Sequence, residues 1–226
     1  MVSKTYIIAT IRPWNIANFH KYFSAKKNYH LIQNKSEMTV EHLRRLHPRY
    51  IFFPHWSWII SEEIWRNFEC VVFHMTDLPF GRGGSPLQNL IIRGFKNTKI
   101  SAIRVSDGMD TGNIYLKRPV SLKGSAEQIY ARLSQIVFSD MIPHIIKNEP
   151  TPTPQTGKIT LFKRRLPEES NLEPVKTISD AYDFIRMLDA PEYPKAFLQT
   201  KGLRFEFSKA RLRKNKLAAQ VEVYEK

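Results

Sequence analysis

The sequence predicts an α/β protein with a Rossmann-like, open and mostly parallel sheet, helices on both faces, and a small C-terminal α+β appendage. Apolar runs at 6–10, 50–53 and 70–73 are short and lack polar alternation, as expected of strands that are covered on both faces. Helical patterns lie between these runs, and this alternation favours a parallel sheet. The chain has 226 residues, of which 42% are hydrophobic, and can bury a core of ordinary size.

The other elements follow from helix starts and strand patterns. Thr39, Ser61 and Ser85 are suitable N-cap residues, and Ser125 opens a capping box. The predicted helices cover 16–23, 39–47, 61–68, 86–94, 125–146 and 180–188, and the further strands cover 29–32, 99–105, 114–120, 203–207 and 220–224.

The composition changes at Pro150–Gly157, where alternate prolines cannot form a regular ladder, so this stretch is a linker or a surface crossing. The predicted division is a core over 1–149, a Pro-rich linker over 150–157 and a small C-terminal subdomain over 158–226. The basic run Lys209–Lys216 is expected to be a solvated turn, with contact to a polyanion as the alternative.

Charge and cysteine content limit the classes of partner and site. The net charge of +14 and the pI near 9.9 favour nucleic acid, anionic membranes or phosphorylated small molecules. The single cysteine, Cys70, lies inside an apolar strand and is expected to pack in the core, so neither a disulfide framework nor a metal site is predicted. No apolar run is long enough to cross a membrane and no secretory signal is present, so we expect a cytoplasmic protein without a membrane partner.

A histidine and a glycine-rich loop follow the strand at 70–73. His74 comes where this strand ends, and Gly81, Gly83 and Gly84 give the loop a backbone that can lie close to a ligand. Ligands of open α/β sheets bind at the carboxyl ends of the strands. A titratable imidazole is therefore expected where a ligand binds.

This stretch resembles the signature of the folate-dependent formyltransferases, Asn-x-His-x-Ser-Leu-Leu-Pro-x-x-Arg-Gly followed by Pro. The matching positions are His74, Leu78-Pro79, Arg82-Gly83 and Pro86. A later stretch, Asp110-Thr111-Gly112-Asn113-Ile114, is similar to the family's Asp-x-Gly-x-Ile segment, whose aspartate is catalytic. Residues 185–197 resemble a segment that follows the catalytic core in sugar and tRNA formyltransferases.

The resemblance implies transfer of a formyl group from N10-formyltetrahydrofolate to an amine. His74 would be the general base or acid, and Asp110 would orient its imidazole and stabilise its charged form. Val72 stands where the family has its catalytic asparagine, and its side chain cannot donate a hydrogen bond to a tetrahedral oxyanion. The favoured explanation is another donor, and those left open are protonated His74, N–H groups of the glycine loop, Asn89 and Ser57. The alternative is a weak or altered catalyst.

The resemblance also implies binding contacts in several loops. The candidate folate contacts are Trp56, Ser57, Trp58, Asp107 and Met109. The candidate substrate contacts are Arg82, Gly83 and Asn89, together with Trp14 and Asn15, which lie in the loop after the first strand, where ligands of such sheets commonly bind. Five of these residues have structural alternatives: Trp56 and Trp58 could close the edge of the core, Trp14 could be a packing cap, Asp107 could form a turn, and Arg82 could brace its loop.

The expected acceptor is the amine of a nucleotide-linked deoxy amino sugar used for surface polysaccharides. Methionyl-tRNA formyltransferases carry a β-barrel domain, for which the roughly 70 residues after the linker leave little room. Purine-pathway enzymes of the fold lack a segment like Ala190–Pro194. The alternatives are a tRNA-directed formyltransferase and a degenerate scaffold that binds nucleic acid through Lys209–Lys216, although nucleic acid is the less expected partner. A homodimer is compatible with the family.

Overall fold

The computed structural model describes residues 4–225, which form two compact units. The N-terminal unit contains the chain up to Arg82 together with Lys99–Val120 and Ala131–Leu161. The C-terminal unit contains Gly83–Thr98, Ser121–Tyr130 and the chain from Phe162 onward. Residues 83–98 and 121–130, which the sequence analysis placed in the core, thus group with the C-terminal unit, whereas the Pro-rich segment groups with the N-terminal one.

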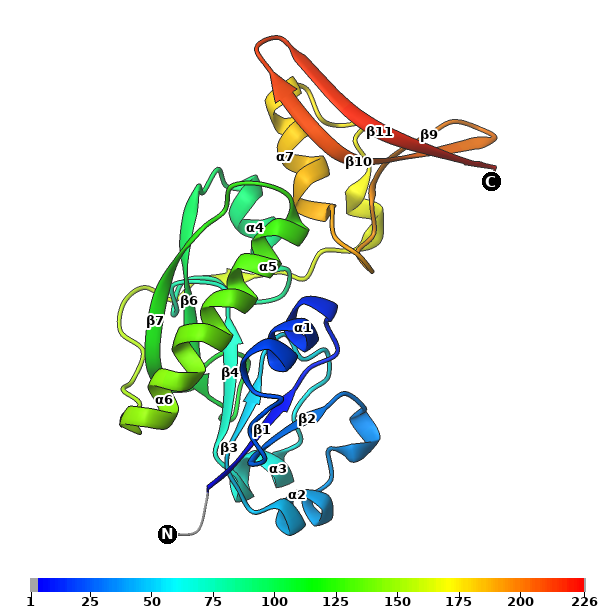
Figure 1. Ribbon diagram of the computed structural model, residues 1–226. Coiled ribbons are helices and arrows are strands. Elements are labelled where there is room, and N and C mark those ends of the chain that lie inside the picture. Colours follow the sequence, from blue (N-terminus) through cyan, green and yellow to red (C-terminus); the bar gives the residue numbers. More distant parts are fainter. Residues whose placement is uncertain (1–3, 226) are drawn as a thin grey trace. The chain divides into compact units, whose positions relative to one another are not determined.

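A six-stranded sheet of order β2-β1-β3-β4-β6-β7 organises the first part of the chain (Figure 1). Its strands are β1 (Thr5–Ala9), β2 (Tyr29–Ile32), β3 (Pro48–Phe53), β4 (Cys70–His74), β6 (Asn97–Arg104) and β7 (Ile114–Ser121). Strands β1 to β4 pair in parallel, whereas β6 pairs antiparallel with β4, with Ser101 opposite His74. The predicted open, mostly parallel sheet is confirmed.

Helices cover both faces of this sheet, as predicted. Helices α2 (Val40–Leu46) and α3 (Glu62–Asn67) pack on the face that carries Cys70. On the other face, α1 (Pro13–Tyr22) lies beside the helical run formed by α5 (Ala126–Ile136), a π-helical segment (Val137–Met141) and α6 (Ile142–Asn148).

Local sequence signals explain several of these boundaries. The Thr39 hydroxyl accepts a hydrogen bond from the N–H of His42 and so caps α2. The capping box before α5 is present, with reciprocal hydrogen bonds of 3.1 and 3.3 Å between Ser125 and Gln128. Cys70 packs in the apolar core as predicted, and burial raises the pKa of its thiol.

The C-terminal unit contains α4 (Pro86–Ile92), α7 (Ile178–Leu188) and an antiparallel sheet of order β11-β10-β9. The strands are β9 (Ala196–Gln199), β10 (Leu203–Arg213) and β11 (Lys216–Glu225). Buried Arg186 of α7 donates hydrogen bonds to the carbonyls of Leu122 and Gly124, at 2.7 and 2.9 Å. The predicted α+β appendage is therefore confirmed.

The basic run Lys209–Lys216 differs from the expected turn. Strands β10 and β11 continue through it, and only Lys214 and Asn215 form the turn. The run is therefore the far end of a long hairpin, with Arg211, Arg213 and Lys216 on paired strands and Lys214 in the turn.

Short elements complete the chain between these larger ones. They are the 3₁₀ turns Lys35–Glu37 and Pro167–Ser170 and the two-stranded pair β5 (Arg82–Gly83) and β8 (Leu161–Phe162). Ser85 precedes α4 as predicted but does not cap it with its side chain. Its backbone has a φ of +48°, and its hydroxyl accepts a hydrogen bond from the N–H of Arg165 at 3.0 Å.

Candidate active site

His74 ends β4 with 9% of its side chain exposed and faces two acceptors. Its Nε2 lies 2.7 Å from the carbonyl oxygen of Gly81. Its Nδ1 lies 3.4 Å from a carboxylate oxygen of Asp110. A neutral imidazole carries one N–H and can donate to only one of these oxygens, whereas an imidazolium donates to both. The geometry therefore places an acceptor oxygen at each ring nitrogen of His74.

Asp110 lies beside His74 although β6, the strand before its loop, runs antiparallel to β4. Because β6 runs antiparallel to β4, the loop after β6 begins beside the start of β4, where Val105 donates to the carbonyl of Cys70 at 2.9 Å. Residues 105–113 then bring the Asp110 carboxylate to the imidazole. Asp110 adopts a φ of +56°, which is uncommon for residues other than glycine.

Gln155 is a site residue that the sequence analysis missed. Its amide oxygen accepts two hydrogen bonds from Arg82, and its amide nitrogen donates to the carbonyls of Asp110 and Gly112. The stretch Pro150–Gly157 also contains three threonines, so nothing in the sequence distinguished Gln155. Of the two roles left open for Arg82, these bonds favour the loop brace.

The glycine loop uses most of its own N–H groups. The N–H groups of Gly81 and Arg82 both donate to the carbonyl of Thr160 at 3.0 Å, and that of Gly84 donates to Phe162 at 3.1 Å. Gly83 has a φ of +108°, and a Cβ there would lie 2.4 Å from the carbonyl oxygen of Phe162. These three N–H groups are therefore not free to stabilise an oxyanion in this conformation.

Asp77 occupies a loop position where the family signature has leucine. Its carboxylate pairs with Lys99 at 2.9 Å and with Lys117 at 2.5 Å. Burial raises the pKa of Asp77, but the hydrogen bonds and charges of the two lysines outweigh it and lower the pKa below its usual value. The exchange of leucine for aspartate thus has a local structural reason.

Three positions that bear on the oxyanion, Val72, Asn89 and Ser57, contact other parts of the protein. Val72 packs against the apolar cluster that includes Ile51 and Phe53. The Asn89 amide donates to three backbone carbonyls, those of Gly84, Ser85 and Lys163, at 3.1, 3.0 and 2.9 Å. Its N–H groups are thus committed to bracing the start of α4. Ser57 is exposed, and its hydroxyl accepts a hydrogen bond from Arg12 at 3.3 Å.

The proposed folate contacts come from two loops. Trp56 and Trp58 meet edge to face with centroids 4.7 Å apart, and Trp56 also packs on the core, as its structural alternative predicts. Met109 is 69% exposed. The Asp107 carbonyl accepts a hydrogen bond from the Thr111 hydroxyl at 2.6 Å, which is a turn contact. None of these positions has a contact that identifies a ligand.

The start of α1 is held by residues that directly follow β1 and β3. Asn15 is 2% exposed, and its amide donates to the Thr10 hydroxyl at 3.0 Å and to the Pro54 carbonyl at 2.8 Å. The Trp14 carbonyl accepts a hydrogen bond from Ser134. His55 lies 5.6 Å from the Trp14 ring, and burial together with the nearby charge of Arg12 lowers its pKa to about 3. The amide of Asn15 is therefore engaged by the protein itself.

The residues brought together in the N-terminal unit are thus His74, Asp110 and Arg82, with Gln155 between the last two. Over residues 4–225, no cluster of three or more His, Cys, Asp or Glu residues is arranged to hold a metal ion. Within the same range no helix has the length and apolar character required to cross a membrane.

Two family models match the chain. Residues 16–142 match the model described as Formyl transferase, and residues 167–224 match the one described as Methionyl-tRNA formyltransferase, C-terminal domain. The curated methionyl-tRNA formyltransferase of Thermodesulfovibrio yellowstonii is 30% identical over 133 residues, which are 56% of this chain and 43% of the relative. The chain thus spans less than half the length of that relative.

Solved structures extend the match to the whole chain. The methionyl-tRNA formyltransferase from Clostridium thermocellum is 52% identical with a TM-score of 0.95, covering 99% of this chain and 100% of that one. A likely sugar N-formyltransferase from Mycobacterium tuberculosis shares the fold, with 17% identity, a TM-score of 0.71 and coverage of 88% and 93% of the two chains. Because the first family model alone matches more than half of the chain, this protein belongs to the formyl transferase family.

Proposed function

We propose that this protein transfers a formyl group from N10-formyltetrahydrofolate to the amino group of an aminoacyl-tRNA. The observation that carries the proposal is the 52% identity over the whole chain with a structure named methionyl-tRNA formyltransferase. The sequence analysis expected a nucleotide-linked amino sugar and kept tRNA as an alternative. The comparisons favour that alternative.

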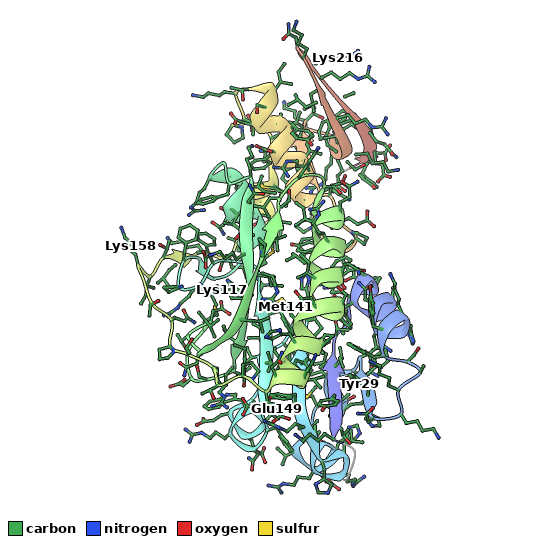
Figure 2. All side chains as sticks on the ribbon, turned by 60° about the vertical axis from the view of Figure 1, so that its left-hand side comes forward. Tyr29, Lys117, Met141, Glu149, Lys158 and Lys216 are labelled. Atoms are coloured by element: carbon green, nitrogen blue, oxygen red, sulfur yellow. The ribbon has the colours of Figure 1, made fainter. Side chains whose placement is uncertain are left out.

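The surface charge of the C-terminal hairpin supports a polyanionic acceptor. Figure 2 labels Lys216 at the far end of the hairpin, where the two strands meet at their turn. The cations exposed along this end are Lys209, Arg211, Arg213, Lys214 and Lys216. None of them makes an ion pair with a residue of the described chain, so their charge is available to phosphates.

Formyl transfer to an amine needs a group that takes a proton from the attacking nitrogen and delivers one to the departing nitrogen. His74 suits this role because imidazole exchanges protons near neutral pH and is mostly buried here. Asp110 faces Nδ1 and stabilises the imidazolium that forms. His74 would then be the proton carrier and Asp110 its orienting partner.

The oxyanion would be stabilised by the same imidazolium. Val72 has no donor, the Asn89 amide is committed, and three N–H groups of the glycine loop bind other carbonyls. The Nε2 proton of His74 is directed at the Gly81 carbonyl. It could instead serve the oxyanion once substrate displaces this carbonyl, so the loop after β4 would shift on binding.

The test measures tetrahydrofolate release from formyltetrahydrofolate with three acceptors: methionyl-tRNA, UDP-linked amino sugars and dTDP-linked amino sugars. Turnover with the aminoacyl-tRNA that disappears in His74→Ala supports the proposal. Turnover with an amino sugar but not with tRNA would contradict the proposed acceptor and favour the nucleotide-linked amino sugar expected from the sequence. Salt-dependent RNA binding without turnover would favour the nucleic-acid-binding scaffold.

A charge variant tests the hairpin separately. Arg213→Glu combined with Lys214→Glu should raise the KM for tRNA several-fold and flatten its salt dependence, while leaving the KM for the formyl donor unchanged. Lys158→Glu is the matched control because Lys158 is exposed and lies in the N-terminal unit (Figure 2). Equal effects of the two variants would rule out a specific role for the hairpin.

A further inference from the structure

The side chain of Gln155 joins two loops of the N-terminal unit. Its Oε1 accepts hydrogen bonds from Nε and Nη2 of Arg82, at 3.1 and 2.8 Å. Its Nε2 donates to the carbonyl oxygens of Asp110 and Gly112, at 2.7 and 2.8 Å. A glutamine amide has two N–H donors and one oxygen with two lone pairs. Every hydrogen-bonding position of this side chain is therefore used.

The segment that carries Gln155 is fixed on both sides of it. Thr153 pairs with Ile114 through two backbone hydrogen bonds of 2.7 and 2.9 Å. The carbonyl of Thr160 accepts hydrogen bonds from two N–H groups of the loop after β4, both at 3.0 Å. Gln155 is thus presented from a backbone that is already anchored, and little ordering entropy opposes its contacts.

The loop that carries Asp110 needs support from outside. Asp110 has a φ of +56°, and a Cβ on Gly112 would lie 1.7 Å from the carbonyl oxygen of Arg104. Such backbone conformations persist where the surroundings fix them. The two hydrogen bonds donated by Gln155 fix the carbonyls on both sides of Thr111. They hold the backbone from which the Asp110 carboxylate reaches His74.

The chemistry at position 155 requires both a donor and an acceptor without a charge. A carboxylate would accept from Arg82 but would repel the carbonyls of Asp110 and Gly112. An aliphatic side chain would serve neither loop. A neutral amide also leaves the positive charge of Arg82 uncompensated, so the guanidinium can still attract an anion.

We propose that Gln155 is a positioning residue that holds Asp110 against the His74 imidazole. It touches neither His74 nor any reacting atom, and it acts through the backbone of Asp110. Small displacements in such an arrangement have large effects, since about 1 Å of misplacement can cost on the order of 10²-fold in rate. The kinetic part of this inference rests on the proposed formyl transfer, whereas its geometric part does not.

The geometric part is tested without any acceptor. In protein labelled with ¹⁵N-histidine, the shifts of the two ring nitrogens of His74 are followed through the carbon-bound ring hydrogens at fixed pH. Asp110→Asn gives the reference for an imidazole that has lost its carboxylate. Gln155→Leu and Gln155→Glu should move the His74 signals toward that reference, and Gln155→Leu should add nothing in the Asp110→Asn background.

Thr156→Ala is the matched control, because Thr156 is exposed on the same segment. Its His74 signals should equal those of the parent protein. Unchanged His74 signals in Gln155→Leu would overturn the proposal. So would an equal change with and without the Asp110 carboxylate, because Gln155 would then act by another route. Circular dichroism of each variant ensures that folded proteins are compared.

The kinetic part uses whichever acceptor gives turnover. Gln155→Leu should lower kcat by about 10- to 100-fold with the KM for the formyl donor within about 3-fold of the parent value. Gln155→Glu should lose as much kcat although it keeps an acceptor for Arg82. A raised KM with unchanged kcat would assign Gln155 to substrate binding and overturn the positioning role. Absence of turnover with every acceptor would count against the proposed function, while the nitrogen shifts would still decide the role of Gln155.

Discussion

The loop after β4 and the loop after β6 both contribute to the site, but they are supported differently. In the first, N–H groups of the glycine-rich stretch bind backbone carbonyls of the segment around Thr160. In the second, the hydroxyl of Thr111 closes a turn and a distant side chain, Gln155, binds the carbonyls around it. The first loop depends on main-chain pairing, which tolerates many side chains. The second depends on one amide, so a single substitution can release it.

The largest expected effects are on turnover. His74→Ala, at the end of β4 where the first loop begins, removes the proton carrier and should lower kcat by about 10²- to 10⁴-fold. Asp110→Asn, in the second loop, keeps the carrier and removes the charge that orients it, with an expected loss of about 10²-fold. Steady-state kinetics of the two variants shows which one loses more kcat. A larger loss for Asp110→Asn would show that the second loop carries the chemistry.

Glycine substitutions compare the rigidity of the two loops. Gly112→Ala places a Cβ 1.7 Å from the Arg104 carbonyl, and Gly83→Ala places one 2.4 Å from the Phe162 carbonyl at a φ of +108°. We expect each to lower the free energy of unfolding by about 2–3 kcal/mol, with Gly112→Ala the more severe. Gly202→Ala is the control, because nothing lies within 4 Å of its Cβ. Urea unfolding gives the comparison, and an effect at Gly112 no larger than at Gly202 would refute the close packing of the second loop.

Val72→Asn, in the strand that leads into the first loop, tests whether the site lacks an oxyanion donor. Val72 packs on the apolar cluster, so an amide there should lower the free energy of unfolding by about 1–2 kcal/mol. If the His74 imidazolium stabilises the oxyanion, turnover should change by less than about 3-fold. A rise of about 10²-fold or more, of the size expected for a restored oxyanion donor, would show that the site had been missing it. Kinetics and urea unfolding of the same preparation separate the two effects.

The smallest expected effect is on the pH dependence of the protein's stability, through Asp77 in the first loop. The lysines beside Asp77 lower the pKa of its carboxyl in the folded protein. The ionised carboxylate therefore stabilises the folded state above the pKa that Asp has in the unfolded chain, which is about 4. This contribution is lost as the pH falls below that value. Asp77→Asn should therefore be less stable than the parent by a few tenths of a kcal/mol at pH 7, because the pair is partly exposed, and equal to it at about pH 2–3. Thermal unfolding of the parent and of Asp77→Asn across this pH range measures the difference, and an equal difference at pH 7 and at low pH would contradict the prediction.

Much of the fold could be predicted from the sequence because its signals are local. Apolar runs without alternation marked β1, β3 and β4, and N-cap residues marked α2 and α5. Strand direction is not a local property, and the run at 99–105 carries no sign that β6 is antiparallel. For a similar reason the predicted strands at 203–207 and 220–224 are shorter than β10 and β11. Lysines and arginines are common in turns, but cross-strand pairing extends β10 and β11 through them.

The site divides in the same way. The motifs located His74 and Asp110, and the structure places their side chains 3.4 Å apart. Their roles, and those of the suggested folate and substrate contacts, remain predictions. Gln155 was missed because its partners lie 73, 45 and 43 positions earlier, and such a contact leaves no periodicity in the sequence. Asn15 was assigned to substrate from its place after the first strand and Asn89 from its place in the helix after Pro86, and their amides bind backbone carbonyls.

Gln155 comes later in the chain than every strand of the main sheet, so the residues that form the sheet and the residue that supports the site are separated in the sequence. All six strands of the main sheet end by Ser121, and α6, which ends the helical run on one face of this sheet, ends at Asn148. A truncation ending at residue 150 would retain the sheet, His74 and Asp110, yet lack the amide that holds the second loop. During synthesis the sheet residues likewise leave the ribosome before Gln155 does. Assembly of the fold can therefore precede assembly of the site, and a truncation series would divide one from the other.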